Sequence, residues 1–249
     1  MRRNYKGISI NTSKNTHEKV FELIRKDHKL TIIDIPSGSG AFVQRLKDAG
    51  FAKIIAIDID NILEIEHDDF IRGDMTKPLS VADQTADIVV CIDGIEHINN
   101  QAGFVREVYR ILKDQGEFVV SSPNISSIRS RWKWLMTGHH HKCDSPLDEN
   151  NPNPLHHVGM ISFSELRYLL HTNGLQISKV DTNRIKPVSL LFSILVPFIY
   201  VSTLWVYLRQ GKKHNTLKMN KEVLKEMFSL NILFGETLIV KAIKKGSLQ

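Results

Sequence analysis

The segment "IIDIPSGSGAF", residues 32–42, joins a carboxylate to two glycines at the end of an apolar run. The apolar run predicts a buried strand and the residues after it a helix, so Gly38 and Gly40 would form the turn between the two. Glycine adopts positive φ and lets the backbone approach a ligand closely. A dinucleotide site for hydride transfer would need a third glycine where this chain has Val43. We therefore expect either a nucleotide site of another kind or an ordinary strand-to-helix turn.

Carboxylates also end the next two predicted strands. Asp58 closes the apolar run 52–58, where a carboxylate after the second strand would meet a ribose. The two ribose hydroxyls donate hydrogen bonds and an ionised carboxylate only accepts them, so the pairing is chemically suitable. Asp60 is the nearby alternative. Asp74, after the third predicted strand, could accept a hydrogen bond from an adenine amino group, with Met75 packed on the ring.

The fourth predicted strand ends in "CIDGIEHI", which places Asp93, Glu96 and His97 at its carboxyl end. Open parallel sheets bind their ligands beyond the carboxyl ends of the strands. Four successive strand ends therefore offer polar groups toward one rim. Histidine is the usual general base for an unactivated hydroxyl, so His97 is a candidate base, together with His156 and His157 farther along the chain.

The elements that would carry these residues alternate between strand-like and helix-like patterns, which is typical of a parallel sheet wound with helices. Amphipathic periodicity predicts helices at 17–27, 40–50, 101–116 and 162–175. The last of these opens with a capping pattern, Ser162 followed by Glu165. Short apolar runs predict strands at 30–35, 52–58, 69–74, 86–93, 116–124, 176–183 and 236–245.

Composition is consistent with one folded domain over residues 1–249: 42% of the residues are hydrophobic and 24% are charged. Two cysteines build no disulfide framework, which favours a reducing compartment. The basic start lacks the apolar run of a secretory signal, so we expect a cytoplasmic protein.

Charge is concentrated at one end of the chain. Residues 209–249 carry nine Lys and Arg against three Asp and Glu, which accounts for the whole net charge of +6. A local basic patch indicates an anionic partner, either a nucleic acid or a membrane surface, with a solvated tail as the alternative.

In combination, these segments resemble the class I S-adenosylmethionine-dependent methyltransferases. The resemblance covers roughly residues 30–180, with the seventh strand near 236–245, and is carried by "IIDIPSGSGAF", "AIDID", "RGDMTKPL", "ADIVVCIDGIEHI", "FVREVYRILKDQGEFVVSSPN" and "HHVGMISFSELRYLLHTNGL". It implies an α/β fold: a doubly wound, mostly parallel seven-stranded sheet with helices on both faces and the last strand antiparallel.

The resemblance also implies roles for individual residues toward S-adenosylmethionine. It places Asp34, Gly38 and Gly40 around the amino acid end of the cofactor. Asp58 would hold the ribose, and Asp74 with Met75 would hold the adenine. Asp93 would line the pocket near the methionine portion. The family usually has glycine where this chain has Pro36, whose fixed φ would change the entry to the turn.

Two histidines, His97 and His157, are the predicted catalytic residues. In related O-methyltransferases of quinone biosynthesis, an acidic residue, a glutamate and a histidine after strand four hold a divalent metal, and Asp93, Glu96 and His97 are similar to that set. A structural or substrate-facing role for His97 is favoured over a metal site.

The run "HHHKC" at 139–143 does not have the spacing of a structural zinc site. The "DGIE" sequence differs from the motif of base-modifying amino methyltransferases, so no nucleic acid partner is expected.

Two segments lie outside the common pattern. Residues 125–160 are predicted to form a lid-like loop region over the substrate, and residues 187–230 a hydrophobic and basic insertion between strands six and seven. Within the insertion, 188–208 is uncharged for 21 residues, long enough to cross a membrane. A single crossing would separate two strands that belong to one sheet. The segment could instead form two short packed helices broken at Pro197, lie in a membrane interface through 188–213, or be buried in a dimer.

Taken together, the sequence favours a methyltransferase that acts on a hydroxyl of a lipid-linked or cell-envelope glycan or a related metabolite, peripheral to the inner face of the membrane. The alternatives are a quinone-pathway O-methyltransferase and a cofactor-binding, membrane-associated partner without turnover. The acceptor atom, the use of a metal and the oligomeric state stay open.

Overall fold

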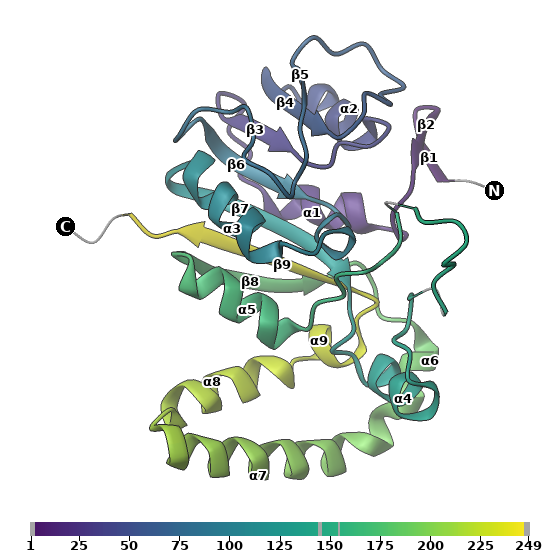
Figure 1. Ribbon diagram of the computed structural model, residues 1–249, viewed down its shortest axis with the longest axis vertical. Coiled ribbons are helices and arrows are strands. Elements are labelled where there is room, and N and C mark those ends of the chain that lie inside the picture. Colours follow the sequence, from purple (N-terminus) through teal and green to yellow (C-terminus); the bar gives the residue numbers. More distant parts are fainter. Residues whose placement is uncertain (1–2, 144–145, 154, 247–249) are drawn as a thin grey trace.

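The computed structural model describes residues 3–143, 146–153 and 155–246. Its centre is a seven-stranded sheet with the spatial order β5-β4-β3-β6-β7-β9-β8 (Figure 1). The strands are β3 (Thr31–Asp34), β4 (Lys53–Asp58), β5 (Phe70–Arg72), β6 (Ala86–Cys91), β7 (Leu112–Pro123), β8 (Leu175–Thr182) and β9 (Thr237–Lys244). Neighbours from β5 to β7 are parallel, whereas β9 is antiparallel to both β7 and β8. The expected doubly wound, mostly parallel sheet with an antiparallel last strand is confirmed.

Helices cover both faces of this sheet, because successive residues of a buried strand point to opposite sides. On one face, Ile32 packs with apolar residues of α1 (Thr16–Leu23) and α2 (Ala41–Asp48). On the other face, Ile33 packs with α3 (Gln101–Ile111) and α5 (Phe163–Thr172). The Ser162–Glu165 capping box at the start of α5 is present as expected.

Two helices end four or five residues before the end that their sequence pattern predicts. The α3 helix ends at Ile111 and not at residue 116, because Leu112 is extended (φ −72°, ψ 138°) and pairs with Ala86 of β6. The α1 helix ends at Leu23 and not at residue 27, because Ile24 is extended (φ −76°, ψ 151°). In both places, residues whose local pattern favours a helix are extended in the structure.

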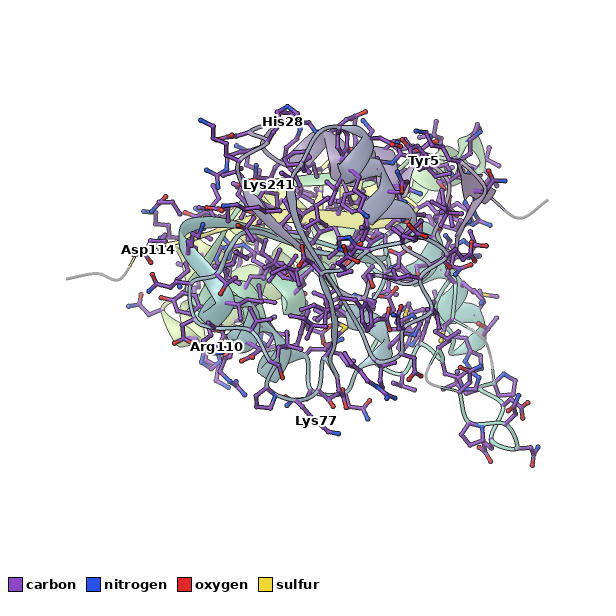
Figure 2. The ribbon with its side chains drawn as sticks, turned by 90° about the horizontal axis from the view of Figure 1, so that it is seen from above. Tyr5, His28, Lys77, Arg110, Asp114 and Lys241 are labelled. Atoms are coloured by element: carbon purple, nitrogen blue, oxygen red, sulfur yellow. The ribbon has the colours of Figure 1, made fainter. Side chains whose placement is uncertain are left out.

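The N-terminal residues form a hairpin that the sequence did not predict, with strands β1 (Arg3–Tyr5) and β2 (Ile8–Ile10). Tyr5 (labelled in Figure 2) donates a hydrogen bond from its hydroxyl to Asp48 of α2, at 2.8 Å. The guanidinium carbon of Arg45 lies 4.4 Å from the centre of the Tyr5 ring. These contacts hold the hairpin against α2, beside the end of the sheet that carries the glycine turn.

Between β8 and β9 the insertion is entirely built of helices and turns. It contains α6 (Pro187–Leu190), a 3-10 turn η2 (Leu191–Leu195), α7 (Val196–His214), α8 (Leu217–Met227) and α9 (Leu230–Phe234). Pro197 lies in the first turn of α7, where proline is tolerated because its missing N–H would have had no partner. In Figure 1, α7 is the outermost element, and α8 lies between it and α5.

Within the described residues, the segment Pro187–His214 is the one helical stretch long and apolar enough to cross a membrane. Its mean hydropathy is 2.0 over the most apolar window, of which only 6% is buried. Part of the segment does pack on the domain, since Phe192, Leu195, Val196 and Ile199 lie against the buried cluster of Ile128, Leu233 and Phe234. Packing on the domain, contact with a membrane interface and burial in a dimer all stay predictions. Because β8 and β9 pair along their length on either side of it, a single crossing does not fit the fold.

Candidate functional site

A cavity of about 560 Å³ opens at the carboxyl ends of β3, β4 and β6. This volume is within the range of small-molecule sites. Residues from four parts of the chain line it: the N-terminal segment, the glycine turn, the strand ends and the 125–160 region that the sequence predicts to be a lid, called the lid below. Of the residues expected from the sequence, it is lined by Asp34, Gly38, Asp58, Asp93, His97 and His157.

The glycine turn forms the floor of the cavity. Gly38 and Gly40 both have positive φ, 52° and 84°. A Cβ atom on Gly38 would meet no atom within 4 Å, which leaves its backbone open for the approach of a ligand. A Cβ atom on Gly40 would lie 2.9 Å from Cγ1 of Ile65, so this glycine serves close packing and does not itself line the cavity. The Ile35–Pro36 peptide bond is cis, and the Pro36 ring lies against Gly94.

Asp58 ties the end of β4 to this turn. Its Oδ2 accepts a hydrogen bond from the Gly38 amide at 2.8 Å, and its Oδ1 accepts one from the Ile59 amide at 2.7 Å. The side chain is buried apart from the part that lines the cavity. Each carboxylate oxygen keeps a second lone pair, so Asp58 has acceptor capacity left for two hydroxyls such as those of a ribose.

Asp34, at the end of β3, is a buried carboxyl group with an oxygen that nothing in the described residues hydrogen-bonds. Its side chain is almost fully buried, and Oδ2 has no hydrogen-bond partner among those residues. Burial raises the pKa of Asp34 well above its usual value, and the nearby charge of Asp58 adds to the effect. A cationic ligand group in the cavity would supply the missing partner, which fits the amino end of an amino acid.

Beyond β6, a second acidic pair faces the cavity. Asp93 adopts φ 46°, uncommon outside glycine, and its Oδ1 accepts a hydrogen bond from the Ser121 hydroxyl at 2.6 Å. Glu96 belongs to the 3-10 turn η1 (Ile95–His97) and is fully buried, and neither of its carboxylate oxygens has a hydrogen-bond partner among the described residues. Burial, followed by the charge of Asp93, raises the pKa of Glu96 well above its usual range.

His97 and His157 meet edge to face, with ring centroids 4.8 Å apart. Nδ1 of His97 lies 3.3 Å from the carbonyl oxygen of His156, and Nδ1 of His157 lies 2.9 Å from that of Lys142. When Nδ1 carries the hydrogen and donates to the carbonyl, Nε2 keeps a free lone pair. Burial, and then the charge of His157, lower the pKa of His97, so its neutral form, the one able to accept a proton, prevails at neutral pH.

Glu96, His97 and His157 also offer ligand atoms that all lie within 4.8 Å of one another. Two imidazoles and one carboxylate form a donor set that suits a divalent transition metal. The sequence pointed to Asp93, Glu96 and His97 for such a site, so the lid histidine is the new member of the group.

Asp74 and Met75 do not line the cavity. Asp74 closes its own turn, accepting hydrogen bonds from the Thr76 amide (2.9 Å) and hydroxyl (2.7 Å), and it pairs with Lys77 at 3.3 Å. Lys77 projects outward at the edge of the molecule in Figure 2. Met75 packs against the core on the α3 face. Their expected contacts with adenine stay predictions.

The structure adds cavity residues that local sequence patterns did not reveal. The N-terminal segment contributes Arg3, Ser9, Asn11, Thr12, Ser13 and His17. The lid contributes Lys142, whose ammonium pairs with Glu236 at 2.9 Å and bonds the Ser13 hydroxyl. The polar run 11–15 reads only as a loop in sequence, and its position over the cavity depends on the hairpin packed on α2.

Comparison with known proteins agrees with this arrangement. Residues 12–180 match the methyltransferase domain family. Over 171 residues the chain is 28% identical to a probable S-adenosylmethionine-dependent methyltransferase of Mycolicibacterium smegmatis, covering 65% of this chain and 58% of that protein. Over 117 residues it is 27% identical to the ribosomal RNA large subunit methyltransferase E of Methanococcoides burtonii, covering 40% and 43% of the two chains. The chain thus spans about half the length of these curated relatives.

Solved structures share the fold at low identity. An S-adenosylmethionine-dependent methyltransferase from Archaeoglobus fulgidus superposes with a TM-score of 0.56 at 16% identity, covering 92% of each chain. One from Mesorhizobium loti gives 0.54 at 14% identity, covering 91% of this chain and 96% of the other. With more than half of its residues matched, and with the strand order and cavity described above, this chain belongs to the methyltransferase domain family.

Proposed function

We propose that this chain transfers the methyl group of S-adenosylmethionine to a hydroxyl of a lipid-linked or cell-envelope glycan or a related metabolite. The observation that carries the proposal is the presence, in one cavity, of Asp58 bonded to the Gly38 amide and of two histidines, His97 and His157, whose ring centroids lie 4.8 Å apart. Asp58 and the Gly38 amide suit the binding of a nucleoside, and the two histidines can accept a proton. Together they describe a site for a nucleoside cofactor and a hydroxyl acceptor.

The cavity residues fit the cofactor. Asp34 would meet the amino group, Asp58 the ribose hydroxyls, and Asp93 would line the neighbourhood of the methionine portion. When bound, S-adenosylmethionine supplies a methyl group already activated by its sulfonium. The chain therefore has to align the acceptor oxygen with that methyl and to remove the hydroxyl proton.

His97 or His157 takes that proton. An unactivated hydroxyl holds its proton tightly at neutral pH, and a neutral imidazole within hydrogen-bond reach accepts it as the oxygen attacks. The carbonyls of His156 and Lys142 hold the two Nδ1 atoms and so orient the rings. The lid residues around His157 would exclude water, and Lys142 fixes the lid to Glu236 at the start of β9.

A membrane-associated acceptor is supported by the exposed apolar segment 188–213. Its flanks are basic, and its tyrosine and tryptophan side chains, Tyr200, Trp205 and Tyr207, are of the type found at the level of lipid headgroups. We place the protein on the cytoplasmic face of a membrane, in peripheral contact through this segment. The enzyme would then meet a lipid-linked hydroxyl where that substrate resides.

Incubation with methyl-labelled S-adenosylmethionine tests the reaction. We expect label in an envelope-lipid fraction, with little transfer by the His97→Ala and His157→Ala variants. Label in quinone precursors instead would favour the quinone-pathway alternative. Label in ribosomal RNA would favour the activity that the name of the Methanococcoides relative states for that protein. Cofactor binding with no transfer to any of the three would favour a partner protein without turnover.

A further inference from the structure

The outer side of the insertion exposes a regular row of large apolar side chains. Leu191 is 75% exposed, Phe198 73% and Trp205 61%. Together with Ile194 and Val201 they follow one another at intervals of three and four residues. Phe198, Val201 and Trp205 therefore share one face of α7, and Leu191 and Ile194 precede them on η2. Soluble surfaces rarely present such a continuous apolar strip without a partner.

The helix α4 (Ile128–Thr137) lies next to this segment and also exposes large apolar side chains. Its exposed residues include Trp134, Leu135 and Met136. The two segments are packed together, since Ile128 shares a cluster with residues of η2 and α7, and the rings of Trp132 and Phe192 lie 6.4 Å apart. The exposed residues of both segments are called the α4–α7 surface below: Trp132, Trp134, Leu135, Met136, Leu191, Ile194, Phe198, Val201 and Trp205.

The charged residues around the α4–α7 surface are all basic. Neither residues 125–143 nor residues 182–221 contain an aspartate or a glutamate, whereas both contain several basic residues. At the end of α7, Arg209 lies over the ring of Trp205 at 5.5 Å, followed by Lys212 and Lys213. The acidic residues of α8 face the other way, since Glu226 pairs with Arg167 of α5.

One cation lies between the two apolar segments without a counter-ion. The guanidinium of Arg131, on α4, is partly buried and makes no hydrogen bond or ion pair with any residue in the described part of the chain. Burial lowers its pKa, and the side chain that acts on it electrostatically is Tyr207 of α7. A partly buried, unpaired guanidinium is unfavourable unless an anion joins it, and a guanidinium binds phosphate with two parallel hydrogen bonds.

We propose that the α4–α7 surface docks on an anionic phospholipid bilayer, with Arg131 binding a headgroup phosphate. The proposal rests on the membrane contact proposed above and extends it to α4. The bilayer is favoured over a second copy of the chain because an interface between two identical surfaces would bring like charges together. It is also favoured over a crossing helix because the strands on either side of the insertion, β8 and β9, pair with each other in one sheet.

This surface is connected to the cavity through Glu236. Its carboxylate pairs with Lys186, one residue before α6, and with Lys142 of the lid, both at 2.9 Å, and also with Arg184. The next residue, Thr237, lines the cavity, as does Pro123, five residues before α4 begins. Docking would therefore set the cavity mouth close to the lipid surface.

Vesicle flotation of the full-length chain tests the proposal, and it requires neither cofactor nor acceptor. We expect flotation with phosphatidylcholine vesicles that contain phosphatidylglycerol and little flotation without that lipid. Arg131→Gln should weaken binding about fivefold, the effect of one basic residue near an anionic surface, while Arg131→Lys retains most of it. The double change Trp134→Ser/Leu135→Ser should weaken it further.

Tyr168→Ser provides the matched control, because Tyr168 is 67% exposed but lies on α5, away from the α4–α7 surface. It should float like the unchanged chain, and thermal melting verifies that every variant is folded. Unchanged flotation of both α4 variants would overturn the proposal. Dimerisation in sedimentation, lost in Phe198→Ser/Trp205→Ser, together with no vesicle binding, would assign the surface to a second copy. Loss of S-adenosylmethionine binding alone would refute the proposed function and leave this inference standing.

Discussion

Two regions of the molecule differ in which groups they bury and which they expose. Around the cavity, polar groups are buried and await partners: Asp34 and Glu96 have carboxylate oxygens without hydrogen bonds among the described residues. In the insertion, apolar groups are exposed and await partners, as for Leu191 and Phe198. The match to the methyltransferase domain family covers residues 12–180 and so includes the first region, whereas the second lies beyond residue 186.

This difference indicates that the two regions bind different kinds of partner. Unsatisfied buried carboxylates mark where a small polar ligand would bind, because an uncompensated polar group in the interior is unfavourable. Exposed apolar side chains mark where a large surface would bind. The first region thus lies in the part of the chain that matches the methyltransferase domain family, and the second is the surface that the proposed membrane contact would use. Substitutions in one region should leave the other unaffected.

The largest effect is expected at the proposed base. His97→Ala or His157→Ala should lower the transfer rate about 10²- to 10⁴-fold, the usual contribution of a general base, with S-adenosylmethionine affinity nearly unchanged. Single-turnover rates and calorimetry measure the two quantities. Because the pKa of His97 is lowered from 6.5, the unchanged chain should keep its rate as the pH falls below that value. A fall in affinity as large as the fall in rate would argue against the base.

A smaller effect is expected at the ribose position. Asp58→Asn should weaken S-adenosylmethionine binding about 10- to 100-fold, because hydrogen bonds to a charged acceptor are lost. Asp60→Asn is the matched control: Asp60 is exposed, pairs with Arg72 at 2.7 Å, and does not line the cavity. Equal losses in the two variants would show that the sequence alternative, Asp60, is as important as Asp58.

A stability effect should come from His17, which is buried near the cavity and has its pKa lowered by burial to about 3. The unfolded chain binds a proton at this residue below about pH 6.5 and the folded chain does not, so stability falls as the pH falls from 6.5 toward 3. Between pH 6.5 and about 4.5 the loss is on the order of 2 kcal/mol. Denaturant unfolding of His17→Leu should show a flatter pH dependence, whereas His28→Asn, at an exposed histidine, should keep the slope.

The smallest effect is expected from metal removal. If His97 and His157 act as bases, their Nε2 atoms are not metal ligands, and EDTA should leave the transfer rate unchanged. A loss of activity restored by a divalent metal would instead assign Glu96, His97 and His157 as a metal site and favour the quinone-pathway alternative.

Local pattern was enough for the parts of the site that follow from strand order. Once strands and turns are recognised, Asp34, Asp58 and Asp93 must lie at one edge of the sheet, and the cavity brings them together. Asp74 also ends up near a strand end, but its carboxylate is used by its own turn at Thr76. The sequence pattern therefore predicts where a strand ends more reliably than which way the next side chain points.

Contacts between distant segments could not be predicted in this way. The pairing of Lys142 with Glu236 joins residues 94 positions apart, and the N-terminal hairpin reaches the cavity only by packing on α2. Similarly, the pattern of 101–116 favours a helix throughout, but pairing of Leu112 with Ala86 converts its end to strand. The composition of 188–208 fits a packed helix, a membrane contact or a dimer contact equally well, and only the structure shows that its most apolar stretch is largely exposed.

Titration calorimetry of the full-length chain with S-adenosylmethionine and, separately, with NAD tests the central claim most directly. The account predicts saturable binding of S-adenosylmethionine that is weakened by Asp58→Asn, and no measurable binding of NAD. Tighter binding of NAD, or no heat with S-adenosylmethionine, would contradict it.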